Sequence, residues 1–426
     1  MATAARVARP ERAALVGLIS GRARRLDAER SLDELAGLAQ AAGGEVVLRI
    51  LQERPKPDPS TFLGAGKVKE LAACCAETDA DLVIVDNELT PAQLRQIEEE
   101  VGRKVIDRTQ LILDIFARRA RTREGKLQVE LAQLRYLLPR LVGAGAALSR
   151  LGGGIGTRGP GETKLETDRR RIRTRLHAVT EDIERVRQRR AQLRERRHKA
   201  SVPTVALVGY TNAGKTTLFN GLTRANAAAS DALFVTLDPL VRQIRLPDSR
   251  ELLVSDTVGF IDRLPHALVA AFRATLEEVV EADLALHVID AAAVDRDRRM
   301  AAVRQVLEEV GAGNVPTLDV YNKCDALSLD ERRRLQERDS SAVSISALHG
   351  EGIAELVDTI AAQVALDVRR VTLTFNPEVA SERDRIARVY RHARVVTHEA
   401  HDGKVSIVAD VPRRLLSRLE GARTGR

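Results

Sequence analysis

The sequence predicts an α/β protein in four parts: an N-terminal α/β domain (1–108), a long antiparallel helical hairpin (109–200), a phosphate-loop domain with a doubly wound sheet (201–366) and a small α+β C-terminal domain (367–426). Three observations support this prediction. Apolar runs of strand length alternate with helical patterns in the first and third parts, two heptad seams fill the second part, and a phosphate-loop motif follows the first strand of the third.

The composition excludes several classes of protein. The chain has 426 residues, of which 44% are hydrophobic and 30% charged, so it can bury sizeable cores. Only three cysteines are present, which excludes a disulfide scaffold and a cysteine-rich zinc site. No apolar run approaches the roughly 18 residues that cross a bilayer. We therefore expect a cytoplasmic monomer without a membrane span, and nothing in the sequence indicates peripheral membrane association.

The first part alternates strands and helices. The predicted strands are Ala13–Ile19, Glu45–Ile50 and Asp81–Val85, and the predicted helices are Leu32–Ala42, Val68–Ala76 and Pro91–Val101. Thr90 and Pro91 together form a typical helix start, since a threonine caps the first turn and proline suits the first helical position. Gly64-Ala-Gly-Lys67 resembles a phosphate loop, but it lacks the first glycine and the final Ser/Thr, so we interpret it as a turn that enters a helix.

The second part contains two heptad seams with a loop between them. Leu113–Leu141 and Ile172–Leu193 repeat apolar residues in alternating steps of four and three, which predicts two helices of about 30 residues, with a possible kink at Glu124-Gly125. Their connection, Gly143–Glu166, is rich in glycine and carries Arg150, Arg158 and Lys164. We expect this loop to contact phosphate groups of RNA; the alternative is a disordered linker.

The positive charge of the chain is concentrated in this second part. The net charge is +8, but residues Ala117–Lys199 alone hold 23 basic and 9 acidic residues, a balance of +14. That clustering favours a nucleic-acid partner over a merely solvated helix surface. Aromatic residues make up 3% and tryptophan is absent, so contacts with the phosphates of folded RNA are favoured over base stacking.

The last two parts again alternate strands and helices. Strands of the third part are predicted at Thr204–Val208, Glu251–Ser255, Leu284–Asp290, Thr317–Tyr321 and Ala342–Ile345. In the fourth part, strands are predicted at Val371–Phe375, Arg388–Val396 and Lys404–Ala409, and helices at Glu378–Arg385 and Arg413–Glu420.

A phosphate-binding motif lies directly after the first strand of the third part. The run from Gly209 to Thr216 matches G-x-x-x-x-G-K-[ST] and opens a helix. Glycines allow backbone N–H groups to surround phosphates at a helix N-terminus, Lys215 adds a charge at the β- and γ-phosphates, and the Thr216 hydroxyl is suited to Mg²⁺.

Two further motifs predict that the nucleotide is GTP. Asp256-Thr-Val-Gly259 ends the second strand; we expect Asp256 to hold Mg²⁺ and the Gly259 amide to meet the γ-phosphate. Asn322-Lys-Cys-Asp325 follows a later strand, and a carboxylate at Asp325 can accept two hydrogen bonds from guanine that adenine does not offer. Ser346-Ala347 would present an amide to the guanine carbonyl oxygen.

The complete set of predicted site residues follows from these motifs and from Thr236, a switch threonine expected to reach Mg²⁺ and the γ-phosphate. Lys215, Thr236 and Gly259 are the predicted catalytic residues, and Thr216, Thr236 and Asp256 the predicted Mg²⁺ ligands. Contact with the nucleotide is predicted for Gly209, Tyr210, Thr211, Asn212, Ala213, Gly214, Lys215, Thr216, Thr217, Phe234, Val235, Thr236, Asp256, Thr257, Val258, Gly259, Asn322, Lys323, Asp325, Ser346, Ala347 and Leu348.

Phe260 occupies the position at which many GTPases carry a glutamine that orients the attacking water. Phenylalanine cannot form that hydrogen bond, so intrinsic hydrolysis should be slow unless another group contributes. One candidate is a partner surface that orders the switch segments. Another is K⁺ held beside the phosphates with the help of Asn212; the alternative interpretation of Asn212 is a turn-forming residue.

With these motifs, the chain resembles the HflX family of ribosome-associated GTPases, a translation-factor-related class. The most specific matches lie outside the nucleotide motifs: Asp107-Arg-Thr, the run Arg121–Tyr136 and the run Gly159–Arg169; Asn212 and Phe260 also match. Phe375-Asn-Pro-Glu departs from the family's pattern, and residues 1–108 contain no nucleotide motif of their own.

The resemblance implies a GTPase that binds the large (50S) ribosomal subunit in its GTP form and hydrolyses GTP there. It also implies that the hairpin loop reaches rRNA, and that the protein splits or rescues stalled ribosomes under stress. The alternative is a GTP-gated adaptor, in which the hairpin docks a protein or membrane partner.

Overall fold

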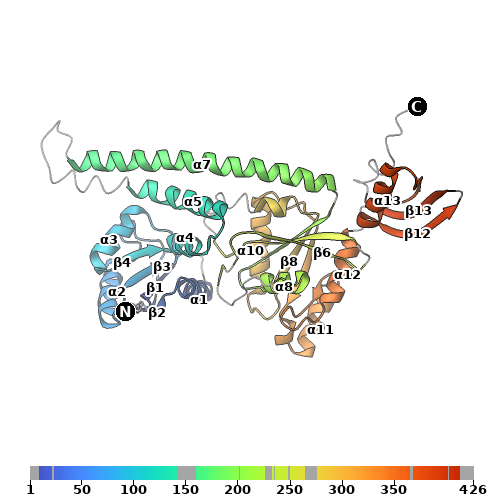
Figure 1. The fold of residues 1–426 in the computed structure, drawn as a ribbon. Coiled ribbons are helices and arrows are strands. Elements are labelled where there is room, and N and C mark those ends of the chain that lie inside the picture. Colours follow the sequence, from blue (N-terminus) through green and yellow to red (C-terminus); the bar gives the residue numbers. More distant parts are fainter. Residues whose placement is uncertain are drawn as a thin grey trace, which may run out of the picture. The chain divides into compact units, whose positions relative to one another are not determined.

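The computed structural model describes residues 9–21, 24–141, 160–200, 202–225, 233–234, 236–247, 250–263, 276–364, 368–401 and 403–412. The chain forms two compact units, each described by itself below (Figure 1). The first contains Met1–Val186 with the segments 231–235 and 265–271, and the second contains the remainder. The division into four parts stays a prediction, because contacts group the chain into these two units.

The first unit is built on a four-stranded parallel sheet in the order β2-β1-β3-β4. Its elements are β1 (Arg12–Ile19), α1 (Arg25–Ala41), β2 (Glu45–Glu53), α2 (Ala65–Glu77), β3 (Leu82–Val85), α3 (Pro91–Val101), β4 (Lys104–Asp107) and α4 (Arg108–Arg119). Strand β4 was missing from the sequence prediction. It has only four residues and begins on a lysine, so its apolar run is too short to stand out.

Apolar side chains of α2 and α3 cover this sheet. Val68, Leu71 and Ile97 pack with Val16 and Val83 in one buried cluster. The predicted start of α3 is confirmed: Thr90 and Gln93 form a reciprocal capping box around Pro91, and Gly102 ends the helix in the left-handed conformation. Local cap chemistry therefore fixes both ends of α3.

A buried carboxylate joins the end of β4 to a later helix, α5 (Arg123–Leu141). Asp107 is fully buried and accepts hydrogen bonds from the Tyr136 hydroxyl and from Arg140, each at 2.9 Å, and also caps α4 through the Gln110 amide. The Arg140 guanidinium lies 3.4 Å from the centre of the Tyr136 ring. Burial, followed by the charge of Asp107, raises the pKa of Tyr136, so the phenol stays protonated. This network fixes α5 to the sheet.

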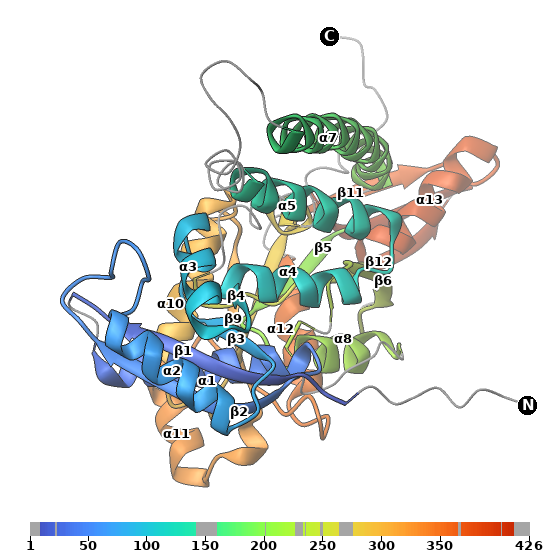
Figure 2. The ribbon, with the colours of Figure 1, turned by 90° about the vertical axis from the view of Figure 1, so that its left-hand side faces the viewer.

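The first predicted long helix is two helices, α4 and α5. The expected kink at Glu124-Gly125 is wrong, because the chain breaks earlier: Ala120 is extended (ψ 112°) and the Thr122 hydroxyl accepts the Gly125 amide at 3.0 Å. The apolar repeat continues across the break, although its two halves pack on different surfaces. Helix α4 buries its apolar face on the sheet, and α5 packs its apolar face against α7 (Pro160–Ala200). Figures 1 and 2 show α5 between α4 and α7.

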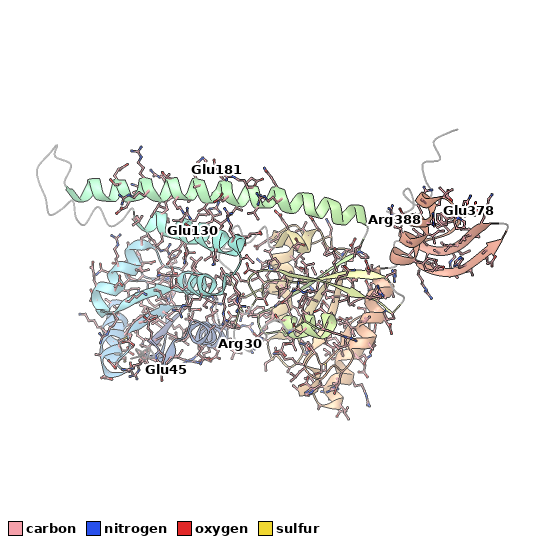
Figure 3. All side chains as sticks on the ribbon, in the orientation of Figure 1. Arg30, Glu45, Glu130, Glu181, Glu378 and Arg388 are labelled. Carbon is pink, nitrogen blue, oxygen red and sulfur yellow. The ribbon has the colours of Figure 1, made fainter. Side chains whose placement is uncertain are left out.

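The predicted antiparallel pairing of the two hairpin helices is confirmed for α5 and α7. Leu127 and Leu131 pack against Val179 and Ile183, with Leu134 and Leu176 beside them. Glu130 on α5, labelled in Figure 3, pairs with Arg175 on α7. The helix α7 is longer than expected, since its 41 residues begin at Pro160, inside the predicted loop. Residues 142–159 lie outside the described part.

The second unit contains a six-stranded sheet in the order β10-β9-β8-β5-β7-β6. Its strands are β5 (Thr204–Gly209), β6 (Leu240–Arg245), β7 (Glu251–Asp256), β8 (Leu284–Asp290), β9 (Thr317–Asn322) and β10 (Val343–Ser344). Helices α8 (Lys215–Thr223), α10 (Arg296–Glu309), α11 (Leu329–Arg338) and α12 (Ile353–Val364) accompany them, with a 3-10 turn at Cys324–Ala326. The core gathers Val205, Leu207, Leu286, Val320 and Leu356.

The doubly wound sheet is confirmed, with one antiparallel strand at its edge. Strand β6 pairs antiparallel with β7, whereas the other pairings are parallel. The sequence analysis missed β6 because Leu240-Val-Arg-Gln-Ile-Arg245 is only partly buried, as an edge strand allows, and lacks a continuous apolar run.

The C-terminal part packs α13 (Ala380–His392) on a three-stranded antiparallel sheet in the order β11-β13-β12. Its strands are β11 (Val368–Phe375), β12 (Arg394–His401) and β13 (Lys404–Pro412). The predicted strand Arg388–Val396 is wrong for Arg388–His392, which completes α13, where Val389 and Ile386 face the core at helical spacing. Its last residues, Arg394–Val396, do begin strand β12. The predicted helix Arg413–Glu420 lies outside the described residues. No helix among the described residues is both long and apolar enough to cross a membrane.

We predict that Asp107→Asn lowers the free energy of unfolding of the first unit by about 2–4 kcal/mol, because it removes the fully buried carboxylate that pairs with the partly buried Arg140. Urea unfolding followed by circular dichroism measures this change. Glu130→Gln breaks an exposed carboxylate–arginine pair and should cost less than about 1 kcal/mol. Equal losses in the two variants would contradict a structural role for the Asp107 network.

Candidate nucleotide site

The site begins where β5 ends and α8 starts. Gly209 and Gly214 have φ angles of 149° and 89°, a region that strongly favours glycine. A Cβ atom at Gly209 would lie 2.3 Å from the Val288 carbonyl oxygen, and one at Gly214 would lie 2.2 Å from the Asn322 side-chain nitrogen. Both glycines are therefore required by conformation and by space, and the loop brings its backbone to the N-terminus of α8, which attracts anions.

Lys215 lies under this loop and is 6% exposed. Its Nζ donates hydrogen bonds to the carbonyl oxygens of Gly209 (3.0 Å) and Tyr210 (2.8 Å). Burial lowers the pKa of Lys215 to about 8, and the charge of Asp256 opposes that shift. A buried ammonium group held by two carbonyl oxygens favours an anionic ligand, since an anion would compensate the desolvation of the charge.

Three oxygen-bearing side chains meet beside Lys215, each from a different segment. Thr216 is in the first turn of α8, Thr236 precedes β6, and Asp256 ends β7. The two hydroxyl oxygens are 2.8 Å apart, and both donate to Asp256 Oδ2, at 2.9 and 3.0 Å. Burial raises the pKa of Asp256, against the effect of Lys215 and the two hydroxyls. The structure thus brings together the three residues predicted to bind a metal.

The donor set fits Mg²⁺. The second carboxylate oxygen of Asp256, Oδ1, is buried and has no hydrogen-bond partner among the described residues. The described part of the chain has no group of three His, Cys, Asp or Glu residues that could hold a metal. That finding is compatible with Mg²⁺, which takes few protein carboxylates and completes its shell with hydroxyls, phosphates and water.

Gly259 and Phe260 follow Asp256 at the same edge of the sheet. A Cβ atom on Gly259 would lie 3.0 Å from Lys215 Nζ and 2.9 Å from the Thr211 side chain, so this glycine lies directly against the phosphate loop. Phe260 is 2% exposed. The side chain at this position is therefore both apolar and buried, and it offers no hydrogen bond to a water molecule.

Asn322 ties the opposite end of the site together. Its Nδ2 donates to the Ala213 carbonyl oxygen at 2.8 Å, and its Oδ1 accepts the Ala347 amide at 2.9 Å. Asn322 therefore links the phosphate loop, the end of β9 and the loop after β10. These three segments carry the predicted nucleotide-binding residues Ala213 and Ala347.

Asp325 is partly exposed and ready to accept hydrogen bonds. A hydrogen bond from Ser346 is the largest of the effects that lower the pKa of Asp325, so the carboxylate is ionised at neutral pH. Next to it, Lys323 has φ 63° and its Nζ lies 2.8 Å from Asp290. Asp290 was absent from the sequence-predicted set, although its position at the end of β8, between two motif-bearing strands, could have indicated it.

The remaining predicted residues lie in several places. Thr211, Thr257 and Val258 are buried, Asn212 is exposed at φ 59°, and Leu348 is 75% exposed. The left-handed backbone of Asn212 is one that asparagine tolerates, which agrees with the turn interpretation, and the K⁺ interpretation stays a prediction. Phe234 belongs to the first unit, where its ring meets Phe116 edge to face with centres 4.7 Å apart.

Some predicted residues lie outside the described part of the chain. These are Val235, Arg150 and Arg158; Lys164 belongs to α7, but its side chain is not described.

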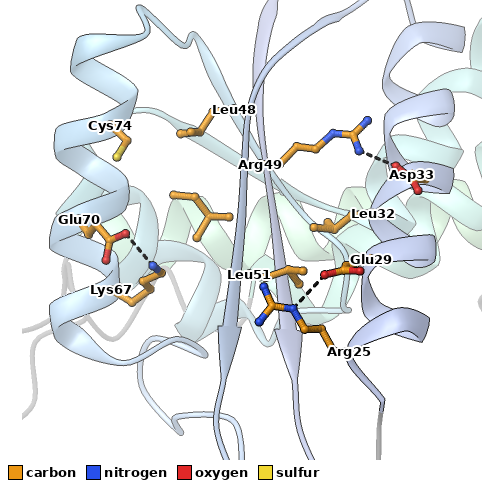
Figure 4. Close-up of a pocket in the computed structure, with 11 residues that line it drawn as sticks. Arg25, Glu29, Leu32, Asp33, Leu48, Arg49, Leu51, Lys67, Glu70 and Cys74 are labelled. Atoms are coloured by element: carbon orange, nitrogen blue, oxygen red, sulfur yellow. Dashed lines mark hydrogen bonds and ion pairs between the residues drawn. The ribbon is translucent and has the colours of Figure 1, made fainter.

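A pocket of about 520 Å³ on the first unit is unrelated to these motifs (Figure 4). It is lined by α1, β2 and α2, and Lys67, from the apparent phosphate loop of the sequence, lies in it. The three cations of its lining each pair with a carboxylate, Arg25 with Glu29, Arg49 with Asp33 and Lys67 with Glu70. Because the charges balance, this pocket has no chemical preference for phosphate.

Comparison with protein families assigns most of the segment 29–323. Residues 29–117 match the family described as the N-terminal region of GTP-binding GTPases, and residues 119–197 match its middle region. Residues 204–323, which hold the phosphate loop, Asp256 and Asn322, match the family described as 50S ribosome-binding GTPase.

Curated relatives agree with this assignment. The chain is 46% identical to GTPase HflX of Caldanaerobacter subterraneus subsp. tengcongensis over 409 residues (96% of this chain, 93% of the relative). It is 48% identical to GTPase HflX of Escherichia coli over 383 residues, 89% of each protein. A GTP-binding protein of Sulfolobus solfataricus in complex with GDP covers 83% of this chain and 98% of its own, with 25% identity and a TM-score of 0.44.

The extent of these matches, together with the phosphate loop, the buried Lys215 and the Asp256 cluster, leads to one conclusion: the chain belongs to the HflX family of GTPases and is a P-loop GTP hydrolase.

Proposed function

We propose that this protein binds the large ribosomal subunit in its GTP form, hydrolyses GTP there, and thereby splits or rescues stalled ribosomes under stress in the cytoplasm. The observation that carries this proposal is the match of residues 204–323, the segment that contains the site, to GTPases described as 50S ribosome-binding.

Phosphate binding is assigned to the loop 209–214 and Lys215. Backbone amides at the N-terminus of α8 and the buried ammonium group together offer the positive charge that a triphosphate requires. Thr216, Thr236 and Asp256 would hold Mg²⁺, which when bound neutralises charge on the β- and γ-phosphates. Guanine recognition is assigned to Asp325, whose ionised carboxylate accepts hydrogen bonds, and to the loop 346–348.

Thr236 connects the nucleotide to the state of the protein. Its hydroxyl lies within 3.0 Å of Asp256 and 2.8 Å of Thr216, so the segment before β6 has a polar anchor in the site. We propose that the triphosphate stabilises this arrangement and that loss of the γ-phosphate releases it. The ribosome must then bind the first state more tightly than the second, because equal affinities would shift no equilibrium.

Hydrolysis requires a group other than residue 260. Phe260 is buried and apolar, so it cannot orient the attacking water. The two candidates for assisting hydrolysis are ribosomal contacts that order the residues around Thr236 and Gly259, and a K⁺ ion near the exposed Asn212. Comparing GTP turnover in K⁺ and in Na⁺ decides between them, since equal rates would exclude a role for K⁺ in hydrolysis.

The basic helix α7 supplies a surface for rRNA. Arg170, Arg171 and Arg173 are exposed on it, and the predicted RNA-contact residues Arg150, Arg158 and Lys164 belong to its first turns or to the preceding segment. A long helix with closely spaced guanidinium groups can track a phosphate backbone, to which arginine binds through two parallel hydrogen bonds.

Co-sedimentation with purified large subunits tests the proposed function. The expected result is capture with a non-hydrolysable GTP analogue, weak capture with GDP, and stimulated GTP turnover on adding subunits. Binding should fall steeply between 50 and 200 mM salt, by roughly tenfold or more if several phosphates are contacted. Capture that depends neither on the bound nucleotide nor on the salt concentration would favour the alternative, a GTP-gated adaptor for a protein or membrane partner.

We predict that Lys215→Ala reduces GTP affinity by at least about tenfold and abolishes turnover, because the phosphates lose their buried counter-charge. Nucleotide titration by calorimetry measures the affinity, and phosphate release measures the turnover. Unchanged turnover would contradict the assignment of the phosphate loop.

We predict that Asp325→Asn weakens GTP binding by about 100-fold or more, because an amide offers one hydrogen-bond acceptor and presents N–H groups to the donors of guanine. The same variant should gain relative affinity for xanthosine triphosphate, whose 2-oxo group accepts a hydrogen bond. Retained preference for GTP over xanthosine triphosphate would remove Asp325 from base recognition.

We predict that reversing the charges of Arg158 and Lys164 to glutamate weakens large-subunit binding by at least tenfold and leaves nucleotide affinity unchanged, because these residues lie far along the chain from the site motifs. The matched control reverses Arg333 and Arg334, two exposed residues on α11, for the same change in net charge. If both variants lose binding equally, the effect is one of net charge and not of the hairpin.

A further inference from the structure

The segment after β7 is attached on both sides of Gly259, to strand β5 upstream and to the phosphate loop downstream. Upstream, β7 pairs in parallel with β5 as far as Leu207 and Asp256, and the Thr257 hydroxyl donates to the Leu207 carbonyl oxygen at 2.6 Å. Downstream, the Phe260 amide donates to the Gly209 carbonyl oxygen (3.1 Å), and the Phe260 carbonyl oxygen accepts the Thr211 amide (2.7 Å). We call residues Asp256–Arg263 the Gly259 segment.

The two attachments are out of register by one residue. Leu207 pairs with Asp256, but Tyr210 pairs with Phe260, so the Gly259 segment has one more residue between the pairings than the phosphate loop has. This extra residue makes a bulge that contains Gly259, and bulges redirect a backbone group out of a regular ladder. The direction of the Gly259 amide therefore depends on how firmly both ends of the bulge are held.

Tyr210 holds the downstream end through its side chain. The Tyr210 hydroxyl oxygen accepts the backbone amide of Asp262 at 2.7 Å, and Tyr210 is 8% exposed. The first turns of α10 support both residues: Arg298 forms an ion pair with Asp262, and the Arg299 guanidinium lies 5.1 Å from the centre of the Tyr210 ring. Arg299 is itself held by Asp295 at 2.8 Å.

We propose that Tyr210 is a positioning residue for GTP hydrolysis, whose phenol fixes the bulge at Gly259 so that the Gly259 amide meets the γ-phosphate. This rests on the proposed contact between Gly259 and that phosphate. The physical reason is preorganisation: a donor already aimed at the transferring phosphoryl group requires no rearrangement in the transition state. The phenol acts through the backbone amide of Asp262, whose hydrogen bond its hydroxyl oxygen accepts.

This assignment also explains why the chain has an aromatic residue at the second position of its phosphate-loop motif. Phe260 lacks the hydrogen-bonding group found at that position in many GTPases, so placement of the Gly259 amide carries more of the catalytic effect. A hydroxyl that approaches from the phosphate loop couples the two segments that contact the γ-phosphate. A smaller side chain at position 210 would not reach the backbone amide of Asp262.

The test is Tyr210→Phe in the full-length protein, which deletes one oxygen and keeps the ring over Arg299. Calorimetry compares the dissociation constants of GDP and of the β,γ-imido analogue of GTP, and steady-state kinetics give kcat and KM. We expect GDP affinity to change less than twofold, analogue affinity to fall about fivefold, and kcat to fall about five- to tenfold. The reason is that the variant loses only the hydrogen bond from the Asp262 amide, which supports the segment proposed to contact the γ-phosphate. Arg298→Gln, which loosens Asp262 more weakly, should lower kcat about twofold.

Two further variants separate the possible outcomes. Tyr136→Phe also loses a buried tyrosine hydrogen bond, in the first unit, and should lower the melting temperature while leaving both affinities and kcat unchanged. Gly259→Ala places a Cβ atom against Thr211 and Lys215 and should reduce analogue affinity more than GDP affinity. If Gly259→Ala shows no such difference, the proposed role of Gly259 fails.

A selective loss in Gly259→Ala without one in Tyr210→Phe would overturn the positioning role of Tyr210 alone. So would a Tyr210→Phe variant that lowers GDP and analogue affinity by the same factor, because that result indicates a structural effect on the whole phosphate loop.

Discussion

The buried charge of Lys215 is the constraint on which the nucleotide site depends. An ammonium group that is 6% exposed needs partners, and the protein gives it two backbone carbonyl oxygens and the nearby Asp256 carboxylate. The effects on the two ionisable groups are opposite in sign and share one cause, since burial lowers the pKa of Lys215 and raises that of Asp256. A bound polyphosphate with its metal would supply the opposite charges that this pair lacks.

The geometry around this pair follows from the sheet. Strands β5, β7, β8 and β9 run parallel, so their carboxyl ends meet at one edge, and the phosphate loop, Asp256, Asp290 and Asn322 all leave from that edge. Asn322 then links three loops by two hydrogen bonds, while Tyr210 and Phe260 link the phosphate loop to the Gly259 segment. The site is therefore organised by contacts between loops, each anchored on a buried strand.

The motif residues of this site could be predicted from sequence because each carries a chemical requirement at a fixed spacing. The glycines at 209 and 214, Lys215, Thr216 and Asp256 satisfy such requirements, and the structure places them together. Tyr210 and Asp262 could not be identified as a pair, because their contact depends on a one-residue bulge that no local pattern encodes. Phe234 was predicted to contact the nucleotide, and only the structure shows that its ring packs on Phe116.

By itself, the sequence determined the α/β class, the cap of α3, the antiparallel heptad pairing and the nucleotide chemistry, since these depend on residues close together or on strict spacing. Only the tertiary structure decided where the first long helix breaks, that Leu240–Arg245 joins the sheet as an antiparallel edge, and that Arg388–His392 is helical. The physical reason is the same in each case. A short apolar pattern fits a helix or a strand about equally well, and its choice depends on which distant surface is available to bury it.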